Sequence, residues 1–162
     1  MKLYKLDKEI KIFISIFLIL LCTGVTLGIM YVYYTTNISM PGISDYYAGS
    51  DVIDEYDIPL EYPKPYAEML LTTHNHIISF AIIFFILGCI FYYNSIVTGT
   101  WKYILIIEPL ISTMFTFGSL WLIRFIDKTF VWITIISSLL LYISFYIMIV
   151  ILLYELLYKK KK

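Results

Sequence analysis

"IFISIFLILLCTGVTLGIMYVYY", residues 12–34, is a run of apolar residues without a single charged side chain. A helix rises 1.5 Å per residue, so about 20 apolar residues span the ~30 Å hydrocarbon core of a bilayer. Further apolar runs of this kind follow at residues 74–93, 103–123 and 130–157. Because backbone polar groups in hydrocarbon must be hydrogen-bonded within their own segment, each run is expected to form a helix. The predicted fold class is an all-α membrane protein.

The composition supports the same assignment. Hydrophobic residues make up 60% of the chain and aromatic residues 19%, whereas soluble domains are only ~45–50% apolar. The chain carries 12 basic and 12 acidic residues, so its net charge is zero and no positive field is available to attract nucleic acid. We therefore expect a lipid bilayer around the chain and no nucleic-acid partner.

The connections between the runs predict how the helices pack. Residues 94–102 and 124–129 are short connections, so the helices on either side of each should lie antiparallel. Residues 35–73 form a much longer connection. We expect one membrane domain, residues 1–162, built as an antiparallel bundle of four transmembrane helices with a long outer loop between the first and the second.

The positions of lysine and arginine predict the orientation, because these residues are the least easily moved across a membrane. Lys64, Arg124 and Lys128 fall on the side of the long loop. The other basic residues fall on the opposite side, and these are Lys2, Lys5, Lys8, Lys11, Lys102 and Lys159, Lys160, Lys161 and Lys162. Both termini are therefore expected in the cytoplasm, with the chain in the inner membrane of a bacterium and residues 35–73 in the periplasm.

The outer loop is acidic and rich in tyrosine. Its acids are Asp45, Asp51, Asp54, Glu55, Asp57, Glu61 and Glu68, against Lys64 alone. Its prolines and glycines prevent a single helix or strand, and Pro65 suits the first position of the second helix. We expect an ordered, extended loop with short helical turns that folds over the histidine end of the bundle. A solvated connector is the alternative.

Both histidines lie in "TTHNHIISF", residues 72–80, where the outer loop gives way to the second apolar run. Two positions on a helix differ by about 200° in direction, so His74 and His76 face opposite sides. The face of His76 also carries Met69, Thr72, Thr73 and Ser79. Threonine and serine side chains there are expected to hydrogen-bond the second ring nitrogen and fix its tautomer, as metal and haem ligands require.

The histidines allow two interpretations. One is a cofactor site at the periplasmic end of the bundle, either axial ligation of haem b or binding of copper or zinc. Other helices carry no histidine, so a bis-histidine haem site would require a dimer. Without a dimer, the second axial position would be filled by a methionine or would stay open. The other interpretation is that both are interfacial residues bonded to loop backbone.

The third run contains a buried acid. Glu108 lies about 9 Å along the helix axis from Lys102, a depth at which a carboxyl group needs a partner or water. Pro109 removes a backbone donor beside it. A polar stripe continues from Glu108 along the same face through Ser112, Thr116 and Ser119. The preferred interpretation of the stripe is interhelical hydrogen bonding, and the alternative is a proton or cation path.

A further feature of the first run is Gly24 and Gly28, a GxxxG spacing that predicts a close helix contact, either within the chain or between copies. A second polar stripe in the fourth run ends at Glu155.

"MLLTTHNHIISFAIIFFILG", residues 69–88, and "IIEPLISTMFTFGSLWLIRF", residues 106–125, resemble a set of small uncharacterised bacterial inner-membrane proteins. In these a Thr-x-His-x-His-like pattern opens one helix, and Glu-Pro with Thr-Phe-Gly marks the next. The likeness covers residues 68–125. It implies a four-helix membrane fold and brings no established activity with it.

The sequence favours a binding or accessory protein over an enzyme, because it contains no nucleophile with a matching base and no glycine-rich phosphate loop. The leading hypothesis is a haem-binding or metal-binding protein for electron transfer or metal handling. The alternative is a structural or assembly subunit of a membrane complex that docks a membrane or periplasmic partner, or a second copy, through the tyrosine-rich loop. The hypothesis of a small transporter that uses Glu108 is weaker, since the sequence shows no pair of broken helices.

Overall fold

The computed structural model describes residues 2–52 and 58–159, and every regular element in that part of the chain is helical. Four of the helices are long and apolar enough to cross a membrane, which confirms the predicted fold class. The elements in order are η1 (Leu3–Lys5), α1 (Lys8–Thr36), α2 (Met40–Ala48), α3 (Tyr66–Tyr92), α4 (Thr100–Phe125), η2 (Lys128–Phe130) and α5 (Val131–Leu157). The expectations that rest on Asp54, Glu55, Asp57 and the last three lysines lie outside the described residues.

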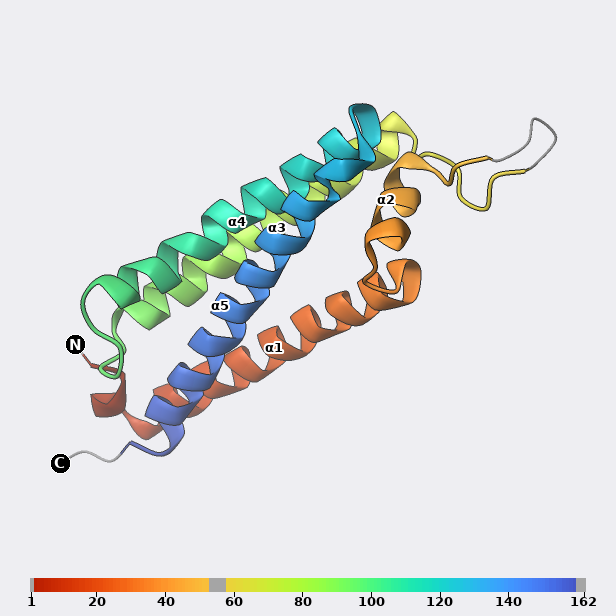
Figure 1. Ribbon diagram of the computed structural model, residues 1–162. Coiled ribbons are helices and arrows are strands. Elements are labelled where there is room, and N and C mark those ends of the chain that lie inside the picture. The colour runs from red at the N-terminus through yellow and green to blue at the C-terminus, as the bar shows by residue number, and fades with distance from the viewer. Residues whose placement is uncertain (1, 53–57, 160–162) are drawn as a thin grey trace.

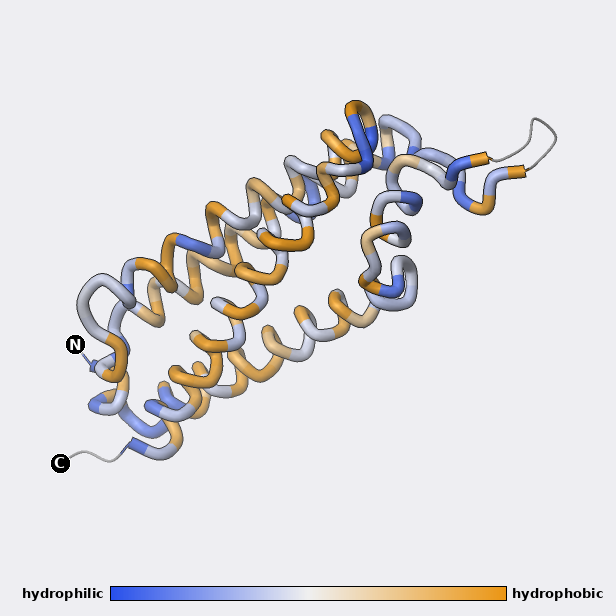
Figure 2. Tube along the Cα trace, viewed as in Figure 1, coloured by the Kyte–Doolittle hydropathy of each residue, from blue (hydrophilic) through white to orange (hydrophobic). Residues whose placement is uncertain are grey.

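The four long helices alternate in direction, so both chain ends lie at one end of the molecule (Figure 1). We call this the termini end, and the opposite end, which carries α2, the cap end. Hydrophobic residues dominate the long helices, and hydrophilic residues gather mainly at the two ends (Figure 2). This distribution is the one expected of segments that are solvated by lipid along their length and by water at their ends.

The core lies where α3, α4 and α5 pack together with part of α1, and α4 and α5 are joined by hydroxyl pairs. Thr116 Oγ1 donates to Ser137 Oγ at 2.8 Å, and Ser119 Oγ lies 2.7 Å from Thr134 Oγ1. Small polar side chains let two helices approach closely, and hydrogen bonds between them stabilise association where lipid tails compete for apolar contact.

The first helix packs differently, because α1 contacts α5 near the termini end and leaves it toward the cap end (Figure 1). Leu18 is fully buried, and Thr26 Oγ1 lies 2.7 Å from the hydroxyl of Tyr146 on α5. Beyond that point the side chains of Met30 and Tyr34 are exposed. The predicted bundle of four helices is therefore present, and α1 joins its core through Leu18 and Val25 along only part of its length.

A sharp corner joins α1 to α2. Asn37 and Ile38 both adopt positive φ angles, 51° and 49°, and a branched residue such as isoleucine is rarely found in this region. A side chain at Gly42 would place its Cβ 2.0 Å from the carbonyl oxygen of Thr36. The corner therefore requires glycine at residue 42, and it turns the chain so that α2 lies across the ends of α4 and α5.

The short helix α2 is the ordered part of the long outer loop. Ser39 caps it by accepting a hydrogen bond from the backbone N–H of Gly42 at 3.0 Å, and Pro41 occupies its first turn, where a missing N–H costs nothing. The expected helical turn is thus a nine-residue helix. Pro65 is the N-cap of α3 rather than its first residue.

The termini end is held by a buried carboxylate, that of Glu155 on α5, which is 0% exposed. Its two oxygens accept hydrogen bonds from the backbone N–H and the hydroxyl of Ser95, each at 2.7 Å. Lys159 Nζ also reaches the Ser95 hydroxyl at 2.9 Å, and Lys102 Nζ donates to the carbonyl of Asn94 at 2.8 Å. The loop between α3 and α4 is therefore anchored to the end of α5.

Replacing Glu155 with leucine is expected to destabilise the fold by about 2–4 kcal/mol, because both donors of Ser95 would lose a buried partner. The measurement is the loss of helical circular dichroism as dodecyl sulfate is titrated into mixed micelles. Glu9→Leu, at an exposed position of α1, is the control and should shift the transition by no more than ~0.5 kcal/mol. Equal transitions for the two variants would contradict the anchoring role of Glu155.

Candidate functional site

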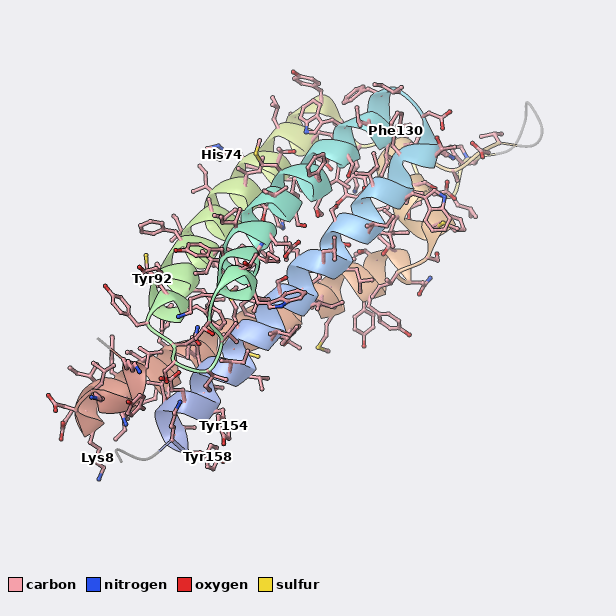
Figure 3. The ribbon with its side chains drawn as sticks, turned by 60° about the vertical axis from the view of Figure 1, so that its left-hand side comes forward. Lys8, His74, Tyr92, Phe130, Tyr154 and Tyr158 are labelled. Carbon is pink, nitrogen blue, oxygen red and sulfur yellow. The ribbon has the colours of Figure 1, made fainter. Side chains whose placement is uncertain are left out.

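The two histidines predicted as a site are both exposed on the surface of α3. His74 lies on the outer side of that helix, away from α4 and α5 (Figure 3). His76 lies against α4, with its ring centroid 4.9 Å from that of Phe117 and 6.3 Å from that of Phe80. The structure therefore keeps the two rings on different faces and gives only His76 an aromatic contact with a neighbouring helix.

One nitrogen of His76 is already engaged. Its Nδ1 lies 2.8 Å from the carbonyl oxygen of Thr72, one helical turn earlier. A carbonyl only accepts, so Nδ1 is the nitrogen that carries hydrogen and Nε2 keeps its lone pair in the neutral ring. The expected tautomer control is present, but it comes from backbone and not from a threonine or serine hydroxyl.

The residues predicted to support the histidines have other partners. Met69 is 1% exposed and packs in the cap-end cluster with Ile43 of α2. Thr73 Oγ1 accepts a hydrogen bond from Trp121 Nε1 at 2.8 Å, which ties α3 to α4. Ser79 is exposed. Met69 and Thr73 therefore hold helices together, and no described hydrogen bond joins their side chains or that of Ser79 to either imidazole.

The described residues contain no group of three or more histidine, cysteine, aspartate or glutamate side chains placed to hold a metal ion. His76 Nε2 is therefore a candidate ligand that stands apart from any such group of described residues.

Glu108 lines a groove between α4 and α5 that has a volume of about 610 Å³. One of its carboxyl oxygens accepts a hydrogen bond from the Ser112 hydroxyl, one turn further along α4. The other, Oε2, is buried and has no hydrogen-bond partner among the described residues. The carboxyl group is thus partly satisfied inside an otherwise apolar groove.

The rest of the polar stripe is occupied by helix packing. Thr116 and Ser119 make the hydroxyl pairs to α5 described above, and Ser119 Oγ also donates to the Thr116 carbonyl at 2.9 Å. Thr113 Oγ1 donates to the carbonyl of Pro109 at 2.7 Å. Only the Glu108 end of the stripe opens into the groove, so the stripe does not continue as a line of free hydroxyls.

The glycines of α1 make no close helix contact within the described chain. A Cβ placed on Gly24 or on Gly28 would have no atom within 4 Å of it. The helix contact that their spacing predicts is therefore not made among the described residues, and this face of α1 is open.

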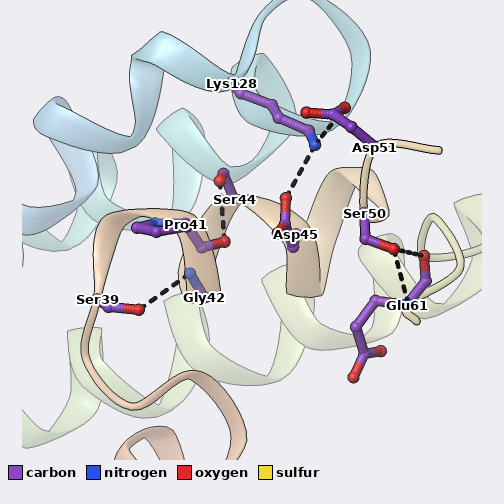
Figure 4. Close-up of polar contacts among 9 residues, drawn as sticks. All are labelled: Ser39, Pro41, Gly42, Ser44, Asp45, Ser50, Asp51, Glu61 and Lys128. Atoms are coloured by element: carbon purple, nitrogen blue, oxygen red, sulfur yellow. Dashed lines mark hydrogen bonds and ion pairs between the residues drawn. The ribbon is translucent and has the colours of Figure 1, made fainter. Parts of the chain in front are cut away.

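At the cap end, α2 is tied to the turn between α4 and α5 by a lysine (Figure 4). Lys128 Nζ lies 2.8 Å from Asp45 Oδ1 and 2.8 Å from Asp51 Oδ1. The Asp45 side chain is 33% exposed and that of Asp51 is 90% exposed. Ion pairs in open solvent contribute little, so the pair with Asp45 carries most of the stabilisation.

Two further contacts hold the segment that leads into α3. Arg124 Nε donates to the carbonyl of Lys64 at 2.8 Å, and Lys64 Nζ lies 4.1 Å from the centre of the Tyr46 ring. Burial is the main cause that raises the pKa of the neighbouring Tyr47 to about 12. Its hydroxyl stays neutral at physiological pH, and the stability from its burial is lost only as the pH rises from about 10 through 12.

Beyond α2 the chain forms a projecting arm, residues 49–52 and 58–64 (Figure 1). Its two sides are joined where the Ser50 N–H donates to the Glu61 carbonyl at 2.9 Å and the Glu61 N–H donates to Ser50 Oγ at 3.1 Å. Apolar side chains on the arm point into the surroundings, and Ile58, Leu60 and Tyr62 are 79%, 93% and 65% exposed.

Sequence reasoning missed the roles of Lys128 and Glu155. It used Lys128 only to orient the chain, and it placed Glu155 at the end of a polar stripe. An acid in the last turns of an apolar helix was the available signal for Glu155, but its partner Ser95 lies far away in the sequence.

Comparison with known proteins gives one match. Residues 37–162 match a protein family that is described as a transmembrane helical domain. Searches among curated proteins and among solved structures each found no match. The family match supports the resemblance to small membrane proteins in its general form.

Replacing Lys128 with methionine is expected to release α2 from the turn between α4 and α5, since Asp45 and Asp51 would lose their shared cation. Amide hydrogen exchange within α2 should become about fivefold faster, the equivalent of ~1 kcal/mol, while exchange within α4 stays unchanged. Glu68→Gln is the control, because the Glu68 side chain is 58% exposed and 3.8 Å from Lys64. Unchanged exchange in the lysine variant would show that packing alone fixes α2.

Proposed function

The chain belongs to this family of transmembrane helical domains, and we propose that it serves as an accessory or assembly subunit of a membrane complex, docking a partner protein through the projecting arm. The observation that carries the proposal is the exposure of Leu60 and Ile58, 93% and 79%, on a segment outside the four candidate spans. Apolar groups gathered outside the membrane typically mark an interaction surface.

Hydrogen bonds order the described part of the arm in the unbound chain. Its two sides are joined between Ser50 and Glu61, and the Lys64 N–H donates to the Tyr47 carbonyl at 3.0 Å. A segment that is ordered before it binds loses less conformational entropy on association. The exposed acids Asp51 and Glu61 would then form part of a polar rim around an apolar and tyrosine-rich centre, which is the usual anatomy of a protein interface.

The proposed location is the cytoplasmic membrane of a bacterium, with the termini end in the cytoplasm. The clustering of lysines at the termini end supports this orientation, because basic residues are retained on the cytoplasmic side. The arm would then lie on the periplasmic face, where a periplasmic or membrane partner can reach it. The open face at Gly24 and Gly28 fits a helix of the same partner or of a second copy.

A transport function receives less support. The hydroxyls of Thr116 and Ser119 are bonded across to α5, which favours the packing interpretation of the polar stripe over a proton or cation path.

Replacing Ile58 and Leu60 together with serine is expected to abolish partner binding, since burial of each side chain contributes about 1.5–3 kcal/mol. The test places a photoreactive amino acid at Tyr62 in cells and looks for one protein crosslinked in a fixed ratio. Val52→Ser, on the same arm and 46% exposed, is the control and should retain the crosslink. Crosslinks to lipid alone would assign the arm to the membrane surface and overturn the proposal.

A second candidate function is favoured by the geometry of His76. Its Nδ1 is fixed on the Thr72 carbonyl, which is how protein metal ligands are commonly oriented, and its Nε2 is left to coordinate. We propose that His76 supplies one ligand to haem b, copper or zinc, and that a second copy or a partner completes the coordination. Electron transfer or metal handling at the cap end would follow.

The His76→Gln variant is expected to lose bound haem or metal, whereas His74→Gln, whose ring faces away from α4, should retain it. The measurement is an absorption spectrum and elemental analysis of the full chain after haem, copper and zinc have each been supplied. A wild-type preparation that remains colourless and free of metal would reject the cofactor function. It would leave the docking function of the arm untouched.

A further inference from the structure

The groove between α4 and α5 contains an acid whose partners are incomplete. A carboxylate has about four lone-pair sites, and the Ser112 hydroxyl fills one of them on Glu108. Oε2 is buried without a hydrogen-bond partner among the described residues. Leaving a carboxyl oxygen unsatisfied in a membrane segment is costly, so such groups are normally paired or placed beside a ligand path.

No basic residue in the described part of the chain forms a salt bridge with this acid. Every salt bridge between described residues lies near the cap end and involves Lys64 or Lys128. Lys102, at the start of α4, donates to the carbonyls of Tyr92 and Asn94 at 3.0 and 2.8 Å. The nearest basic residue on the same helix is therefore already committed to the loop between α3 and α4.

The surroundings of Glu108 have the size and character of a ligand site. The groove volume of about 610 Å³ falls within the ~300–1,000 Å³ range of small-molecule pockets. Its walls are mostly aliphatic and aromatic, with Ile111 and Phe115 on the α4 side and Ile136 and Leu140 on the α5 side. A long apolar group fits these walls, and Glu108 is the charged residue among them.

We infer that this groove binds a lipophilic primary amine, whose ammonium group donates to Glu108 while its apolar body lies between α4 and α5. The ammonium supplies both the charge and the N–H donors that the carboxylate lacks. The terminal torsion of a glutamate side chain is soft, so a small rotation of the carboxyl group presents an oxygen to the groove. This inference is independent of the arm and of the histidines.

The test uses the full chain in phosphatidylcholine nanodiscs and dodecylamine with a photoreactive diazirine on its alkyl chain. Labelled peptides are located by mass spectrometry and are expected from residues 104–115 and 133–140. Unlabelled dodecylamine should compete.

Dodecyltrimethylammonium has charge without N–H donors, and dodecanol has a donor without charge. Each should compete at least about tenfold more weakly, as expected for the loss of a hydrogen bond to a charged group.

Glu108→Gln keeps the side-chain volume, removes the charge and is expected to weaken labelling about tenfold. Ile136→Trp fills the groove from α5 without altering Glu108 and should abolish labelling. Leu139→Trp is the matched control, because Leu139 is 58% exposed on the same helix and is not among the residues that line the groove. Circular dichroism verifies the fold of each variant.

Three results would overturn the inference. The first is equal labelling of the wild type and Glu108→Gln, and the second is equal competition by dodecanol or by dodecyltrimethylammonium. The third is labelling confined to peptides outside the two groove segments. Any of these would assign Glu108 to hydration or to packing and the groove to ordinary lipid chains.

Discussion

The hydroxyl pairs between α4 and α5 are the interactions on which the arrangement of the helices depends. In a bilayer, apolar side chains gain little by leaving lipid for another helix, so close packing and interhelical hydrogen bonds decide which helices associate. Thr116 with Ser137 and Ser119 with Thr134 provide both for α4 and α5. Helix α1 makes contacts of this kind from Thr26 to Tyr146 on α5 and from Tyr31 to Tyr46 on α2. It is therefore joined to α5 as far as Thr26 and to α2 beyond it, so it leaves the other long helices toward the cap end.

A charged side chain holds each end of the core together. At the termini end, a carboxylate on α5 accepts from a loop, since Glu155 holds Ser95. At the cap end, an ammonium in the turn before α5 donates to α2, since Lys128 holds Asp45. Glu108 lies between the two ends, and one of its carboxyl oxygens has no hydrogen-bond partner among the described residues. Helix packing therefore does not explain why an acid is found at this position.

Much of the fold could be predicted from the sequence, because length and hydropathy alone identify a segment that must be a helix in lipid. The short connections also predicted that α3, α4 and α5 pack as neighbours. The contacts of Lys128 and Glu155 could not be predicted, because each joins segments that only the tertiary fold brings together. For the candidate site, helical geometry correctly separated His74 from His76. It did not show that Thr73 is bonded to Trp121, and cofactor binding at His76 stays a prediction.

The corner at Asn37 and Ile38 coincides with a boundary in the chain, because the segment that matches the family begins at residue 37. On one side of the corner lies α1, and on the other side lie α2, α3, α4 and α5. Leu18 and Val25 of α1 nevertheless complete the cluster formed by α3 and α5, so the segment inside the family match depends for part of its buried core on a helix outside that match.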